Sequence, residues 1–167
     1  TLATFVERDV IAGDTTRSIS FVGVGTGSLI TRFYLTHYEI LPARRCVLVA
    51  DPQHPSDKYR SRKAGWLARR RYGALLQQLA DGPDAFSERC GQPPIPYGVI
   101  VTGLTLAPDM NKLDNTVIVN SMYTPPALLR AARDVIYCPV KAERIARERV
   151  TQVLVSSFLQ HGGFTRD

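Results

Sequence analysis

Long hydrophobic runs are missing from this chain of 167 residues. No apolar stretch approaches the ~20 residues that a membrane-spanning helix requires, so we expect no membrane span. The first residues also lack a basic stretch followed by an apolar core, and no secretory signal is visible. A targeting segment that had already been removed would leave no trace in this sequence.

Cysteine is scarce, and Cys46, Cys90 and Cys138 are far apart and odd in number. No pair of them has the close spacing of a zinc site or a redox motif. The three histidines are equally scattered, so no metal-ligand pattern emerges. We therefore expect buried free thiols, no metal site, and a location in the cytoplasm or an organelle matrix, where thiols stay reduced.

Lysine is also scarce, because only four of the 21 cationic residues are lysine and the rest are arginine. The formal net charge is +6. Arginine side chains suit phosphate and carboxylate, so a polyanionic partner is one interpretation of this charge. A GC-rich genome, which favours arginine codons without any binding role, is the other. The remaining composition, 44% hydrophobic and 22% charged, is that of an ordinary globular protein.

Hydrophobic periodicity divides the chain into alternating strands and helices. The predicted strands cover 1–11, 17–24, 45–50, 97–106, 115–120 and 134–140. The predicted helices cover 26–41, 63–80, 127–133 and 141–160. Many β-branched and aromatic residues lie in 26–41, so a strand or hairpin is the alternative for that segment.

Two of these helices carry specific expectations about burial. In helix 26–41, His37 lies on the apolar face, which is typical of a hydrogen-bonded core histidine. In helix 141–160, the inward residues are expected to be Ile145, Val150, Val153, Leu154 and Phe158.

The alternation of strands and helices predicts an α/β fold. We expect residues 1–167 to form a single Rossmann-like, doubly wound domain, with about five mostly parallel strands and helices on both faces. Right-handed crossovers then place the C-terminal ends of the strands at one edge of the sheet.

A glycine-rich stretch, FVGVGTGS at residues 21–28, lies between a predicted strand and a predicted helix. In α/β folds this position opens onto the ligand, because the first N–H groups of the helix have no partner within the helix. These groups and the helix dipole favour phosphate or carboxylate. The expected ligand-binding residues are Gly23, Gly25, Thr26, Gly27 and Ser28, with Asp51 at the end of the next strand holding a ribose hydroxyl pair.

This stretch resembles the glycine loops of three groups of proteins. Dinucleotide-binding domains carry G-x-G-x-x-G, and here the third glycine is replaced by Ser28. S-adenosylmethionine-dependent methyltransferases carry a loop similar to VGVGTGSL, with an acid at the place of Phe21. Tubulin-type GTPases carry GGGTGS, which is similar to residues 23–28, in much longer chains with further nucleotide loops. The resemblances imply a nucleotide, a dinucleotide or S-adenosylmethionine as cofactor. A tight strand-to-helix turn without a ligand is the alternative.

The densest cationic stretch is KYRSRKAGWLARRRYG at residues 58–73. Cations interleaved with aromatic residues can clamp phosphates and stack bases. The alternative is a solvated helix with Trp66 and Tyr72 packed inward. The candidate nucleic-acid-binding residues are Arg60, Arg62, Lys63, Arg69, Arg70 and Arg71.

No catalytic acid, base or nucleophile stands out in the sequence, so catalysis is left open. Thr1 lacks the following lysine that an N-terminal nucleophile needs, and His54 is the one histidine near the expected ligand edge. The leading hypothesis is a domain that binds a nucleotide-like small molecule through its glycine loop. The competing hypothesis is a non-catalytic, arginine-rich component of a larger assembly, such as a ribonucleoprotein particle.

Overall fold

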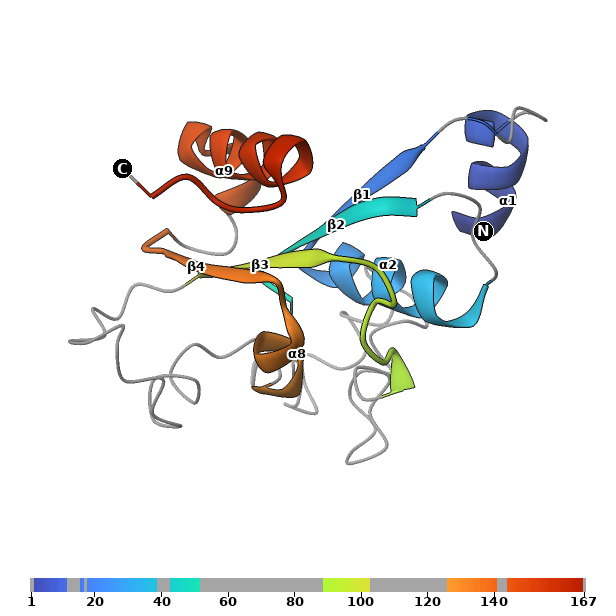
Figure 1. Ribbon diagram of the computed structural model, residues 1–167, viewed down its shortest axis with the longest axis horizontal. Coiled ribbons are helices and arrows are strands. Elements are labelled where there is room, and N and C mark those ends of the chain that lie inside the picture. The colour runs from blue at the N-terminus through green and yellow to red at the C-terminus, as the bar shows by residue number, and fades with distance from the viewer. Residues whose placement is uncertain are drawn as a thin grey trace, which may run out of the picture.

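The computed structural model describes residues 2–11, 16, 18–38, 43–51, 89–102, 126–140 and 144–166. In these residues, four parallel strands form one sheet in the order β1-β2-β3-β4 (Figure 1). The strands are β1 (Ile19–Val24), β2 (Ala43–Val49), β3 (Tyr97–Thr102) and β4 (Asp134–Cys138). The predicted α/β class with a parallel sheet is confirmed.

Other parts of the predicted architecture extend beyond what these residues show. The helix predicted at 63–80 and the strand predicted at 115–120 lie outside the described residues. Within the described strands the spatial order follows the chain order without a reversal, whereas a doubly wound sheet requires one. The fifth strand and the doubly wound topology therefore stay predictions.

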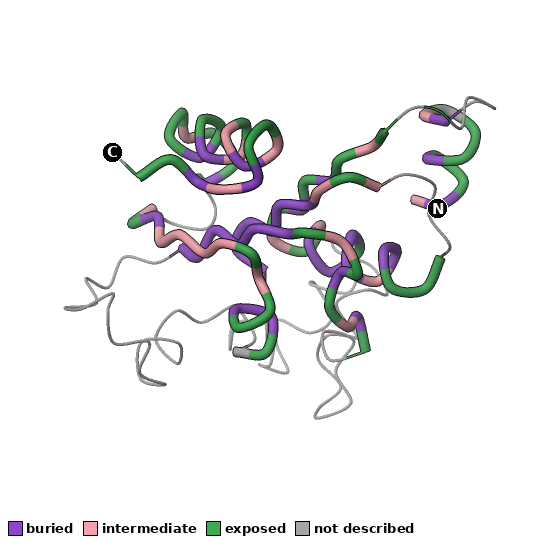
Figure 2. The backbone as a smooth tube through the Cα atoms, viewed as in Figure 1, coloured by how far each residue is buried: buried purple, intermediate pink, exposed green. Residues whose placement is uncertain are grey.

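The central strands β2 and β3 are buried on both faces, as their nearly continuous apolar sequences predict. Successive side chains of β2 enter opposite core clusters: Cys46 and Leu48 enter one, and Val47 and Val49 enter the other. Figure 2 shows the resulting band of buried backbone along the middle of the sheet. All three cysteines are buried and free, as the sequence predicts.

One face of the sheet is covered by α2 (Thr26–His37) and α8 (Pro126–Ala131) (Figure 1). The N-terminal helices α1 (Leu2–Phe5) and η1 (Val6–Ile11) belong to the same core cluster. This cluster contains Ala3, Val6, Ile11, Phe21, Tyr34, Leu35, Cys46, Leu48, Tyr97, Val99, Val101, Leu128 and Leu129.

The other face is covered by α9 (Arg149–His161), which follows the short helix η2 (Ile145–Arg147) (Figure 1). The first turn of α9 lies at the C-terminal edge of the sheet, because Thr151 lies beside Cys138 at the end of β4. The last turn lies at the opposite edge, where the Arg45 guanidinium donates to the Gln160 carbonyl at 2.7 Å. Among the described residues, no helix is both long and apolar enough to cross a membrane.

The predicted strand at 1–11 is wrong, because the described residues 2–11 form α1 and η1. The sequence there alternates weakly at Leu2, Thr4 and Val6, which suggested a strand. The residues that become buried are Ala3, Val6 and Ile11. The spacing from Ala3 to Val6 is helical, and packing against the core overrides the weak alternation.

Three predictions of buried side chains in the helices are also wrong. His37 is exposed, and its Nδ1 lies 3.0 Å from the Phe33 carbonyl, one turn back on the exposed side of α2. In α9, Val150 and Val153 are 49% and 55% exposed. Leu154 and Phe158 are the buried apolar residues of α9, and the partly buried Val155 and Leu159 pack beside them.

Candidate functional site at the C-terminal edge of the sheet

The glycine loop joins β1 to α2 at the C-terminal edge of the sheet, as the sequence predicts. Gly25 is the N-cap of α2, and its φ of 55° and ψ of −124° are accessible essentially only to glycine. No side chain caps this helix start, and no acidic residue lies in its first turn. The helix start therefore presents backbone N–H groups and the positive end of the helix dipole without an acidic side chain from its own first turn.

The loop is anchored to β2 through a single carbonyl group. The Gly25 N–H donates to the Val49 carbonyl at 2.8 Å, and the Ser28 hydroxyl donates to the same carbonyl at 3.3 Å. Ser28 is fully buried, whereas Thr26 is exposed. Of the two hydroxyls predicted to face a ligand, Thr26 is the one at the surface, while the Ser28 hydroxyl supports the loop from inside.

The three glycines of the loop are explained by different physical requirements. A Cβ atom on Gly23 would lie 2.5 Å from the Ser28 Cα, so glycine is required there for the close packing of α2 on β1. Gly25 is required by its positive φ. A Cβ atom on Gly27 would meet nothing within 4 Å, and Gly27 has no positive φ. Within the described part of the chain, neither packing nor backbone conformation therefore requires glycine at position 27.

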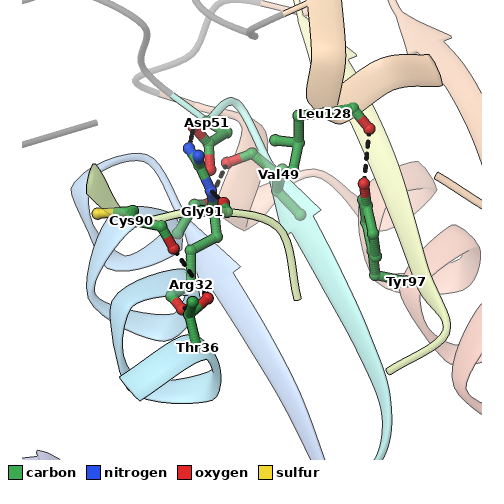
Figure 3. Close-up of polar contacts among 9 residues, drawn as sticks. Arg32, Thr36, Val49, Asp51, Cys90, Gly91, Tyr97 and Leu128 are labelled. Atoms are coloured by element: carbon green, nitrogen blue, oxygen red, sulfur yellow. Dashed lines mark hydrogen bonds and ion pairs between the residues drawn. The ribbon is translucent and has the colours of Figure 1, made fainter. Parts of the chain in front are cut away.

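Asp51 lies at the same edge, directly after β2, but its side chain is fully buried. Its Oδ1 accepts a hydrogen bond from the Arg32 Nη1 at 3.0 Å, and this contact is also an ion pair (Figure 3). Arg32 is 3% exposed, and its Nε donates to the Gly91 carbonyl at 2.9 Å. Asp51 thus takes part in a buried ion pair that joins α2, the end of β2 and the segment before β3.

Burial raises the pKa of Asp51 to about 7, although the Arg32 guanidinium acts in the opposite direction. Cys46, Cys90 and Tyr97 are close enough to interact electrostatically with this carboxyl. Burial raises the pKa of Cys90 to about 11 and that of Tyr97 to about 12. These three groups are therefore neutral near pH 7, and Arg32 is the charged partner of Asp51 in this buried cluster.

The residue between Val49 and Asp51 has an unusual backbone conformation. Ala50 has a φ of 51°, in the left-handed region that non-glycine residues rarely occupy. Its N–H donates to the Ile100 carbonyl at 3.0 Å, so the turn is held against β3. A strained residue of this kind costs on the order of 1–3 kcal/mol and persists only where surrounding contacts hold it, which is common at functional sites.

Sequence reasoning missed Arg32, the residue that contacts Asp51. An isolated arginine in an amphipathic helix is usually solvated, so nothing in its neighbourhood alone indicated burial. The available signal was the combination of Arg32 in the helix after β1 with Asp51 at the end of β2, since parallel topology brings those positions together.

The remaining candidate residues are not brought into this site by the described part of the structure. His54 and the cationic residues Arg60, Arg62, Lys63, Arg69, Arg70 and Arg71 lie outside the described residues. Within the described ranges, no group of three or more histidine, cysteine, aspartate or glutamate side chains could hold a metal ion.

Comparisons with known proteins do not place this chain in a family: no protein-family model, no curated protein and no solved structure matches it. Its function is therefore argued from the site itself.

Proposed function

We propose that the loop from Gly25 to Ser28 binds the anionic group of a nucleotide-like small molecule, either a phosphate or a carboxylate. The ligand classes supported by the sequence are nucleotides, dinucleotides and S-adenosylmethionine, and the last would present its carboxylate. The ligand lies against the start of α2, at the edge where the strands end.

The observation that carries this proposal is the half-buried glycine at position 27. Glycine in a helix is less stable than alanine by roughly 0.5–1 kcal/mol, and neither packing nor φ requires it here. A side chain at this position would project into open space in front of the first turn. Close approach of a ligand to the backbone is the physical reason that remains for having glycine there.

The electrostatics of the helix start favour an anion. The N-terminus of an α-helix carries a partial charge of about +0.5 elementary charge. The first turn of α2 lacks an acidic residue, and its N-cap is a glycine without a capping side chain. An anion bound here would accept hydrogen bonds from backbone N–H groups, with Thr26 offering an exposed hydroxyl beside them.

Asp51 supports this site from inside the protein. The ribose contact expected for Asp51 stays a prediction, and it requires the carboxylate to exchange Arg32 for a hydroxyl pair at the surface. The ligand contact that we propose rests on the backbone of the loop and does not depend on that exchange.

The test is a thermal-shift screen with adenine and guanine nucleotides, dinucleotides and S-adenosylmethionine. A ligand at 100 times its dissociation constant stabilises the fold by roughly 2.7 kcal/mol. Gly27→Ala should make the free protein more stable, by up to about 1 kcal/mol, because helical backbone entropy favours alanine. The same variant should lose most of the ligand-induced shift, and Gly27→Val should lose it completely.

Gly163→Ala is the matched control, because a Cβ there makes only an ordinary contact of 3.5 Å with the Asp134 carboxylate, at the opposite edge of the sheet. This variant should keep the full ligand-induced shift. The proposal fails if none of these compounds stabilises the wild-type protein at millimolar concentration, or if Gly27→Val binds as tightly as the wild type.

A second candidate function is supported by the exposed arginines. Arg144, Arg147 and Arg149 are all exposed and gather at the start of α9, together with the partly buried Glu148. We therefore keep the proposal of an arginine-rich component of an assembly containing nucleic acid. Its binding should weaken steeply with salt, with a log–log slope of about −0.7 per phosphate contact on single strands. A ligand held by backbone N–H groups should be far less sensitive to salt. A location in the cytoplasm or an organelle matrix belongs to both proposals.

A further inference from the structure

We infer that Arg32 is the positioning residue of the glycine loop, and that it sets the geometry of the loop's N–H groups through Asp51 and Val49. This inference deepens the proposed function and rests on it for its ligand-binding part. Arg32 itself is buried on α2, with its charged group directed toward Asp51 rather than toward solvent (Figure 3).

Helix α2 contacts the end of β2 at two separate places. At its start, Gly25 and Ser28 both donate to the Val49 carbonyl. Further along the helix, the Arg32 Nη1 donates to Asp51, two residues after Val49. Helix α2 therefore holds both ends of the segment 49–51. A shift of Asp51 at one end moves the Val49 carbonyl at the other end, which accepts the hydrogen bonds from the loop.

The segment between these contacts is strained. Ala50 keeps its left-handed φ of 51° only because its neighbours are fixed. If the contact between Arg32 and Asp51 is lost, this residue can relax toward a common conformation. The Val49 carbonyl shares a peptide group with the Ala50 N–H, which still donates to the Ile100 carbonyl, so the loss of Arg32 weakens the anchor of the loop without abolishing it.

Arg32 also fixes the segment before β3. Its Nε donates to the Gly91 carbonyl at 2.9 Å, while Nη1 serves Asp51. The planar guanidinium makes both contacts at once, with a geometry that a lysine ammonium does not reproduce. Arginine, and not simply a positive charge, is therefore required at this position.

Thr36 provides a matched control, because it lies one turn further along α2 and contacts the same neighbouring segment. Its hydroxyl lies 2.9 Å from the Arg32 carbonyl within α2, 2.9 Å from the Cys90 carbonyl and 3.4 Å from the Gln92 carbonyl. No described contact joins it to the Arg32 guanidinium or to residues 49–51. Thr36→Val therefore loosens the packing of the segment before β3 and leaves the anchor of the loop intact.

The first experiment needs no ligand. Amide hydrogen exchange at Gly25 is measured in the wild type and in Arg32→Gln, Arg32→Lys and Thr36→Val. Exchange at Gly25 should become about three- to tenfold faster in Arg32→Gln, the change expected when one ordinary hydrogen bond is lost. Arg32→Lys should recover only part of the protection, and Thr36→Val should match the wild type. If Arg32→Gln does not fold, Arg32→Gln combined with Asp51→Asn replaces the buried ion pair by a neutral pair.

The second experiment measures binding of ATP, GTP and inorganic phosphate to the same variants. Affinity should fall at least threefold in Arg32→Gln, less in Arg32→Lys, and not at all in Thr36→Val. Unchanged exchange at Gly25 in Arg32→Gln overturns the inference and leaves the proposed function standing. Faster exchange, together with no binding of these probes or of the dinucleotides and S-adenosylmethionine of the thermal-shift screen to the wild type, supports the positioning role and overturns the proposed function.

Discussion

The helices α2 and α9 cover opposite faces of the same sheet, and both begin at its C-terminal edge, yet their first turns differ in chemistry. α2 begins at a glycine, without an acidic residue in its first turn, and it buries Ser28 and Arg32. α9 also lacks an acidic residue in its first turn, but its N-cap is the acidic residue Glu148, which makes no side-chain capping hydrogen bond, and the helix is held mainly by Leu154 and Phe158. A carboxylate near a helix N-terminus partly satisfies its dipole. This comparison supports the proposal that the first turn of α2 receives an anion, whereas α9 packs against a core cluster.

The largest expected effect tests the role of α9 as a core helix. Phe158 is fully buried and its ring centroid lies 5.0 Å from that of Phe164. Phe158→Ala should lower the free energy of unfolding by about 3–5 kcal/mol, because it leaves a cavity beneath α9. Chemical denaturation measures this loss. If α9 has only a core role, Phe158→Ala protein that stays folded should keep the wild-type rate of amide hydrogen exchange at Gly25.

The next effect concerns the ionisable pair beneath α2. Because the pKa of Asp51 is raised to about 7, the folded state binds a proton more readily than the unfolded state. The contribution of this group to stability is therefore fully present below about pH 4 and is lost as the pH rises toward 7. Its size is on the order of a few kcal/mol.

Denaturant titrations at several pH values check this prediction. As the pH rises from about 4 to about 7, the unfolding free energy of the wild type should fall relative to that of Asp51→Asn. Above that range the difference between the two proteins should stay constant. Among the described residues, Arg32, Cys46, Cys90 and Tyr97 interact electrostatically with Asp51, and burial raises the pKa of Cys46, Cys90 and Tyr97 well above this window. A constant difference across the whole range would show that the Asp51 pKa is not raised.

The smallest of these effects concerns the packing of α2 on β1. A Cβ on Gly23 would lie 2.5 Å from the Ser28 backbone, which is not the flexible end of a side chain and therefore has to shift. Gly23→Ala should cost about 1–3 kcal/mol of stability through overpacking. Thermal unfolding measures this cost. Equal stability of Gly23→Ala and Gly27→Ala would contradict the different reasons given for these two glycines.

The sequence predicted those features that depend on local patterns. The apolar runs of β2 and β3 indicated buried parallel strands, and the glycines after β1 indicated a tight entry into α2. Asp51 was correctly expected at the same edge as the loop. These features follow from hydrophobic periodicity and from the rule that parallel strands end at one edge.

Other features depend on contacts between distant residues, and the sequence did not predict them. The burial of Arg32 is determined by Asp51 and Gly91, which lie 19 and 59 residues away along the chain. The exposure of Val150 and Val153 depends on how α9 is rotated against the sheet, and apolar spacing alone leaves that rotation open. The N-terminal helices form because Ala3, Val6 and Ile11 find a core supplied by later parts of the chain.

The attachment of the last described residues to β4 has a practical consequence for experiments that follow ligand binding and unfolding of the wild type and its variants. The Phe164 N–H donates to the Asp134 carboxylate at 2.8 Å, and Arg166 forms an ion pair with the same side chain. Asp134 begins β4, so this contact lies one strand length, roughly 15–20 Å, from the edge that carries the glycine loop. A fluorophore attached at Thr165, which is exposed, would report on whether the tail is docked and the fold intact, without obstructing the loop. Binding and unfolding can then be followed as separate signals in one sample.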